Sequence, residues 1–178
     1  MKKTLITILA TVLVCCCVVG GTLAWLTATT GPIENTFTVG DINIELKEGA
    51  NLDLKIIPGK AITKDPKVTV AGGSEACWLF VKITETNWST KLTYTAAGWT
   101  ALEGQTGVYY REVAYSANAQ DFPVLTENKV FVDSSLTKTE MEAMATTQPK
   151  LTFTAYAVQS EKVADAAAAW EILFPTNP

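Results

Sequence analysis

The 178-residue sequence contains no histidine and only four cysteines. Without histidine, the chain cannot form a Ser-His-Asp or Cys-His catalytic arrangement or the His-Glu-x-x-His zinc motif. Cys15, Cys16 and Cys17 are adjacent in an apolar run, which leaves Cys77 alone in the remainder of the chain. An internal disulfide framework is excluded there, and a zinc site would rest on one thiol and carboxylates, a poor match to the usual ligand sets.

Formal charge is also missing from residues 4–33, directly after Lys2 and Lys3. Within this stretch an apolar core, residues 5–19, is followed by a pair of glycines and then by small residues up to Ala24. Basic residues, an apolar core and small residues in this order are typical of an export signal. We therefore predict a helical signal peptide over residues 1–24.

The predicted cleavage site lies between Ala24 and Trp25, with Thr22 as the other small position. Cleavage would free the protein from the membrane, so contact with the bilayer is expected only before processing. A retained signal anchor is the alternative, because the uncharged run continues through Leu26 and could just reach across a bilayer.

Removal of residues 1–24 leaves 154 residues, a length that fits one domain with a buried core. The cleaved chain keeps 12 basic and 18 acidic residues, a net charge of 12 − 18 = −6. Such an acidic chain is not expected to bind nucleic acid.

Most of the remaining sequence alternates apolar and polar residues, which predicts half-buried strands. The run 76–84 is apolar on both faces at first and predicts a central strand, and the loop 103–107 predicts a hairpin. Together the pattern predicts an all-β protein, a jelly-roll or Greek-key β-sandwich with one or two short helices. The predicted strands or strand-containing runs are 35–39, 41–46, 67–70, 76–84, 98–102, 108–115, 122–125, 129–132 and 151–158.

Two short helices are expected near the C-terminus. Thr137 and Glu140 have the spacing of a capping box, which predicts a helix that continues to about Ala145. A second helix is expected to end at Pro175. The residues predicted to share its apolar face are Val163, Ala166, Ala167, Trp170 and Leu173.

Two functional alternatives follow from residue types alone. Aromatic residues could form a platform for a polysaccharide, although such residues more often belong to a core. Paired carboxylates could hydrolyse a glycoside, although their spacing does not distinguish a pair from an ordinary acidic surface. The aromatic candidates are Trp88, Trp99, Tyr109, Tyr110 and Tyr115, and the carboxylate candidates are Glu103, Glu112, Glu127 and Asp133.

The sequence resembles the TasA/camelysin family of Gram-positive bacteria. The resemblance is carried by Gly20-Gly21-Thr22-Leu23-Ala24-Trp25-Leu26-Thr27, by the strand-like run 35–44, and by the turn Ile57-Pro58-Gly59-Lys60-Ala61-Ile62-Thr63-Lys64-Asp65. The run 151–159 and the alanine-rich helix around Trp170 are similar to small members with this type of leader.

The resemblance implies cleavage by a SipW-like signal peptidase and residence outside the cell, in the wall or biofilm matrix. It also implies assembly into a fibre, alone or with related matrix subunits, in which residues 25–36 act as a donor strand and Trp25, Leu26 and Ile33 supply the apolar contacts. The sandwich domain would then span residues 37–178. We expect a non-enzymatic structural protein without cofactor or metal; a wall-displayed polysaccharide-binding or adhesin-like module is the alternative.

Overall fold

The computed structural model describes residues 41–49, 55–96 and 98–175. The chain divides into two compact units, Met1–Thr38 and Val39–Pro178. All of the described residues belong to the second unit. The predicted signal peptide and the candidate donor strand 25–36 lie outside them.

The described residues form an all-β sandwich with two short α-helices, as the sequence pattern predicts. The elements in chain order are β1 (Ile44–Lys47), β2 (Ala61–Thr63), β3 (Lys67–Val70), β4 (Cys77–Thr86), β5 (Leu92–Thr93), β6 (Thr100–Ala101), β7 (Val108–Val113), β8 (Gln120–Pro123), a 3-10 helix η1 (Thr126–Asn128), β9 (Lys129–Val132), α2 (Lys138–Thr147), β10 (Lys150–Gln159) and α3 (Ala166–Leu173).

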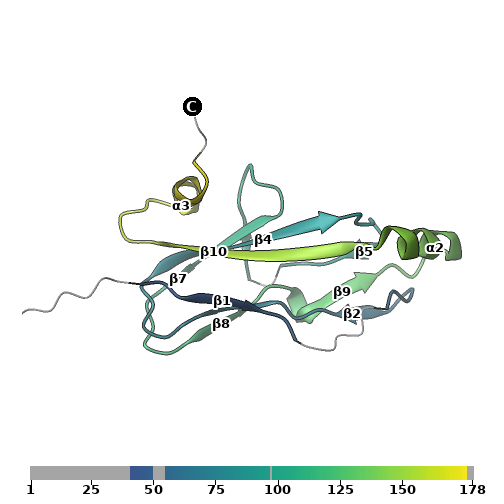
Figure 1. Cartoon of the computed structure of the whole chain (residues 1–178), viewed down its shortest axis with the longest axis horizontal. Coiled ribbons are helices and arrows are strands. Elements are labelled where there is room, and N and C mark those ends of the chain that lie inside the picture. The colour runs from purple at the N-terminus through teal and green to yellow at the C-terminus, as the bar shows by residue number, and fades with distance from the viewer. Residues whose placement is uncertain (1–40, 50–54, 97, 176–178) are drawn as a thin grey trace, which may run out of the picture. The chain divides into compact units, whose positions relative to one another are not determined.

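One layer of the sandwich is a four-stranded antiparallel sheet with the order β10-β4-β7-β6 (Figure 1). Its central strand β4 is paired on both sides, so that Phe80 stands opposite Tyr156 of β10 and Tyr110 of β7. Both faces of β4 are covered, which explains why this run is apolar at consecutive positions. The predicted central strand is therefore confirmed.

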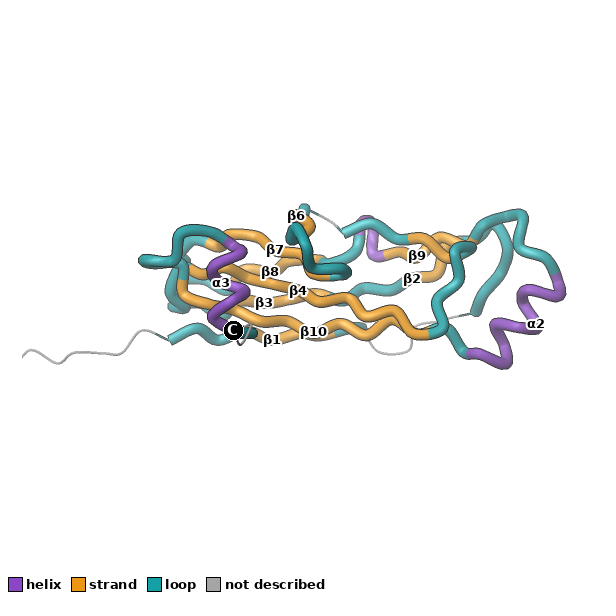
Figure 2. Tube along the Cα trace, turned by 90° about the horizontal axis from the view of Figure 1, so that it is seen from above, coloured by secondary structure: helices purple, strands orange, loops and turns teal. Residues whose placement is uncertain are grey.

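The second layer consists of two three-stranded antiparallel sheets, β1-β3-β8 and β2-β9-β5. Figure 2 shows them end to end, with β2 and β9 toward α2 and the other sheet toward α3. The two sheets are separated where strand pairing is interrupted. This interruption lies at Pro66 between β2 and β3, and at η1 between β8 and β9. Across this break, backbone hydrogen bonds from Lys64 N to Asn128 O (2.8 Å) and from Val124 N to Pro66 O (2.9 Å) join the β2–β3 segment to the β8–β9 segment.

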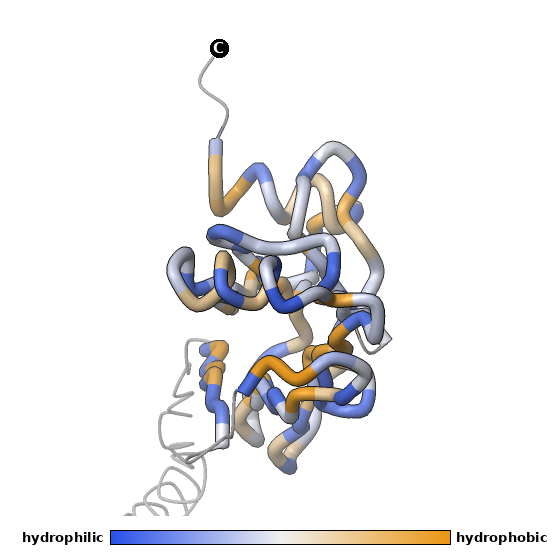
Figure 3. The backbone as a smooth tube through the Cα atoms, turned by 90° about the vertical axis from the view of Figure 1, so that its right-hand side faces the viewer, coloured by the Kyte–Doolittle hydropathy of each residue, from blue (hydrophilic) through white to orange (hydrophobic). Residues whose placement is uncertain are grey.

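Two apolar clusters lie on opposite faces of the four-stranded sheet. The inner cluster fills the space between the layers, which Figure 3 shows one above the other from the end that carries α2. Leu79 and Val81 of β4 are fully buried there. The outer cluster joins Phe80 of β4 to Ala169 and Trp170 of α3, so α3 covers part of the outer face of the sheet (Figure 1).

Both helices begin at side-chain caps. The Thr137 side chain accepts a hydrogen bond from Glu140 N, and Thr137 N donates to the Glu140 carboxylate at 2.7 Å, which confirms the predicted capping box. Asp165 caps α3 by accepting from Ala168 N at 2.8 Å.

The apolar face of α3 differs at one position from the predicted one. Ala167 is exposed, whereas Ala169 is fully buried. Because α3 starts only at Ala166 and its axis is set by Trp170, the buried stripe runs through Ala166, Ala169, Trp170 and Leu173, the ordinary spacing of one helical face.

Candidate functional site

The first feature of interest is the free edge of β10. This strand pairs with β4 on one side, and no other described strand pairs with it on the opposite side. Nine consecutive residues, 151–159, carry no charge. A long uncharged edge presents unpaired backbone N–H and C=O groups, and proteins normally protect such edges with lysine, proline or a covering element. The β10 edge is therefore a ready acceptor for a further strand.

Side chains of β10 alternate between the two clusters beside this edge. Leu151 and Phe153 point toward the inner core, whereas Tyr156 and Val158 belong to the outer cluster. Thr154, near the middle of the strand, is exposed. A strand added here would extend both packed faces of the sheet and could gain apolar contacts on each of them.

The other layer has edge strands of its own, and two of them are β1 and β2. β1 pairs only with β3 and β2 pairs only with β9 among the described strands. Figures 1 and 2 both place β1 beside β10, in the opposite layer. Among the described residues, no strand pairing joins the two layers here.

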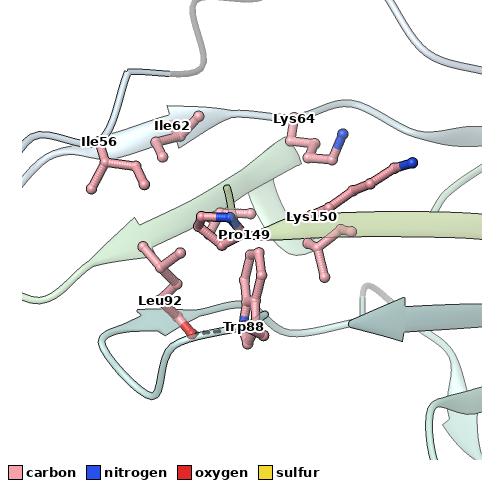
Figure 4. Close-up of a pocket in the computed structure, with 9 residues that line it drawn as sticks. Ile56, Ile62, Lys64, Trp88, Leu92, Pro149 and Lys150 are labelled. Atoms are coloured by element: carbon pink, nitrogen blue, oxygen red, sulfur yellow. Dashed lines mark hydrogen bonds between the residues drawn. The ribbon is translucent and has the colours of Figure 1, made fainter. Parts of the chain in front are cut away.

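A cavity of about 150 Å³ lies near the start of β10, lined by residues of both layers (Figure 4). Most of its lining is apolar, and the Trp88 indole is fixed there by a hydrogen bond from Nε1 to Leu92 O at 3.1 Å. The lining residues are Ile56, Ile62, Lys64, Trp88, Leu92, Val130, Pro149, Lys150 and Leu151.

Two lysines supply the charge of this cavity. Lys64 Nζ lies 2.7 Å from Glu48 Oε1 and 5.3 Å from the ring centroid of Phe153. Lys150 is exposed and forms no ion pair with any residue that the structure describes. One of the two ammonium groups is thus neutralised within the fold and the other is available.

The structure does not bring the predicted aromatic platform together. Trp99 is buried in the inner cluster and its Nε1 donates to Pro123 O at 2.9 Å, whereas Tyr110 packs in the outer cluster. Trp88 lines the cavity and Tyr109 packs against the inner cluster. Tyr115 is 59% exposed and follows β7. These rings lie on different faces, so they offer no common surface to a sugar.

The candidate carboxylates also belong to separate elements. Hydrogen bonding by Lys129 lowers the pKa of Glu127, and hydrogen bonds from Ser135 lower that of Asp133. A glycosidase needs one carboxylic acid with a raised pKa, the opposite of these two. Glu103 lies in the β6–β7 hairpin and Glu112 on β7. No group of three or more Cys, Asp or Glu side chains in the described part of the chain could hold a metal ion.

Cys77 is fully buried in the inner cluster, as expected for a small apolar residue. Burial raises the pKa of its thiol to about 11. A thiol with so high a pKa carries almost no thiolate at neutral pH and is a weak nucleophile.

The residues predicted for cleavage and assembly, namely Thr22, Ala24, Trp25, Leu26 and Ile33, all lie outside the described residues. In the described ranges no helix is long and apolar enough to cross a membrane. Comparison with models of known families, with curated proteins and with solved structures finds no match for this chain.

Proposed function

We propose that this chain is an exported, non-enzymatic structural protein, a subunit or accessory of a cell-surface or biofilm-matrix fibre. A SipW-like signal peptidase would cleave after Ala24 and free residues 25–36. This segment of one molecule would then pair with the free sheet edge of the next molecule, or with that of a related matrix subunit. The proposal extends the resemblance to the TasA/camelysin family to this chain's own residues.

The observation that supports it most directly is the edge of β10 that no other described strand pairs with. An extended peptide that adds to this edge gains main-chain hydrogen bonds, and its alternate side chains face the two sides of the sheet. Trp25 and Ile33, eight residues apart, would share one face, and Leu26 would point to the other. Apolar side chains have places to pack on both faces, because the inner cavity and the outer cluster flank the same strand.

The proposal is tested by comparing purified protein that starts at Trp25 with protein that starts at Phe37. We expect the longer form to assemble into fibres visible by electron microscopy and to increase light scattering, while the shorter form stays monomeric. If both forms remain monomeric over a range of salt and protein concentrations, the fibre proposal fails.

A matched pair of charge variants tests which edge accepts the donor. Thr154→Lys places a cation on the exposed edge strand β10, whereas Thr84→Lys places the same charge at an exposed position of the central strand β4. We expect Thr154→Lys to suppress assembly and Thr84→Lys to leave it intact, with thermal unfolding checked for both. If Thr154→Lys assembles like the unmodified protein, an edge other than that of β10 accepts the donor segment.

A further inference from the structure

The cavity beside the start of β10 has an apolar end and a charged end. Figure 4 shows the Lys64 and Lys150 side chains extending away from Leu92 and Trp88. Both ammonium groups therefore lie at one end of the lining, away from the apolar side chains of Trp88 and Leu92. A ligand that fits both ends has an apolar body and a polar head.

The charge around the cavity indicates which polar head group a ligand would carry. The whole chain carries a net charge of −4, yet this cavity is lined by two lysines and no carboxylate. Glu48 pairs with Lys64, which leaves Lys150 to contact an anion. A single carboxylate complements one available ammonium group, and a charge-assisted hydrogen bond to it is stronger than a neutral one.

The volume of the cavity indicates the size of the apolar part of a ligand. An apolar cavity of about 150 Å³ is large enough to take a benzene-sized group. The ring of such a group would contact Trp88 and Leu151, while a short linker would bring the acid to Lys150.

We propose that this cavity is a binding site for a free, small apolar monocarboxylate, of the size of 3-phenylpropionate. The aromatic body occupies the space between Trp88, Leu92 and Leu151, and the carboxylate accepts a hydrogen bond from Lys150 Nζ. The site lies beside the β10 edge that we propose for assembly, and it adds a small-molecule ligand to the proposed structural role.

The Trp88 indole N–H is the reporter for the test. It lies in the cavity and donates to Leu92 O, and its signal can be assigned among the five tryptophans of the chain with Trp88→Phe. Uniformly ¹⁵N-labelled protein that starts at Phe37, the form expected to stay monomeric, is titrated with 3-phenylpropionate and, in parallel, with 3-phenylpropanol. The alcohol has the same apolar body without the charge.

We expect the acid to shift the Trp88 signal with a dissociation constant on the order of 1 mM, as befits a ligand of this size. The alcohol and the Lys150→Gln variant should each bind about five-fold more weakly, the effect of one charge-assisted hydrogen bond. The control Lys162→Gln removes the same charge in the turn before α3, beyond the other end of β10, and should bind like the unmodified protein.

Four results would overturn the proposal. The Trp88 signal could stay unmoved up to 20-fold above the expected constant, about 20 mM. The alcohol could bind as tightly as the acid, or Lys162→Gln could weaken binding as much as Lys150→Gln. Finally, the Trp88 signal could shift with protein concentration in the absence of ligand, which would assign the cavity to a second copy of the chain and favour its use in assembly.

Discussion

The guanidinium carbon of Arg111 lies 4.2 Å from the ring centroid of Phe122 and 5.6 Å from that of Trp99. Arg111 is the only arginine of the chain, and it stands on β7 of one layer while Phe122 stands on β8 of the other. Its Nε atom is buried without a hydrogen-bond partner in the described structure. Burial lowers the pKa of this guanidinium, so packing and cation–π contact must offset its desolvation.

We predict that Arg111→Ala lowers the free energy of unfolding by about 2 kcal/mol, because it removes both the alkyl packing and the cation–π contacts. Arg111→Met should cost less, since it keeps an apolar chain of similar length and removes a poorly solvated charge. Urea denaturation of the domain measures both values. Equal losses for the two variants would show that the charge itself stabilises the fold.

Trp170 anchors α3 to the outer face of the sheet, with its ring centroid 5.2 Å from that of Phe80 and 5.7 Å from that of Tyr156. Trp170→Ala should make the docking of α3 on the sheet about 3 kcal/mol less favourable, the usual loss of stability when a buried aromatic residue is truncated. The sandwich itself should stay folded, because its inner core lies on the opposite face of the sheet.

Hydrogen exchange can measure separately the opening of α3 and the opening of the sandwich. In Trp170→Ala the amides of α3 should lose protection while those of β4 keep it. Ile172→Ala is the matched control within the same helix, because Ile172 is 58% exposed and should shift stability by less than about 0.5 kcal/mol. Global loss of protection in Trp170→Ala would mean that both faces of the sheet unfold as one unit.

Much of the fold was predictable from local pattern, and the reasons are visible in individual elements. β9 occupies Lys129–Val132 as predicted, because short alternation and turn residues on each side define a strand. The capping box at Thr137 and Glu140 was predictable because its two hydrogen bonds join residues only three positions apart. By contrast β5, with two residues, is defined by its pairing with β9 rather than by its own sequence.

The candidate site was less predictable, because it is made by long-range pairing. The alternation over 151–158 predicts a strand but does not say whether that strand is central or at an edge. The cavity likewise joins Ile56, Trp88 and Leu151, which are distant in sequence and meet only when the layers close. The uncharged run after Lys150 does not settle this, because the central strand β4 also begins with an uncharged run, residues 76–81.

Cys77 should be inert in the folded protein. Its side chain is fully buried, so a reagent cannot reach the sulfur, and burial raises the pKa of the thiol to about 11, so almost no thiolate is present. We expect a disulfide reagent at pH 8 to modify Cys77 only at the rate of unfolding, and at once in denaturant. For this assay the protein must start at Trp25, so that Cys77 is its sole thiol. Rapid labelling without denaturant would reveal local opening of β4.

Asp121 gives the fold a specific sensitivity to acid. Its carboxylate accepts hydrogen bonds from Lys67 Nζ and Thr69 Oγ1, each at 2.7 Å, and these contacts join β8 to β3. The hydrogen bond from Lys67 is the main reason that the pKa of Asp121 is lowered in the folded state. A lowered folded pKa contributes stability that is present above the unfolded value, about 3.9, and is lost as the pH falls through the folded value.

We therefore predict that Asp121→Asn is less stable than the unmodified protein at pH 7 and that this difference shrinks as the pH falls below the unfolded value and the carboxylate is protonated. Urea unfolding at pH 7, 4 and 2 measures the difference, with Glu171→Gln on α3 as a charge-matched control. A difference for Asp121→Asn that is the same at all three pH values would mean that the loss comes from packing rather than from ionisation, since only the ionised carboxylate accepts the Lys67 bond as a charge pair.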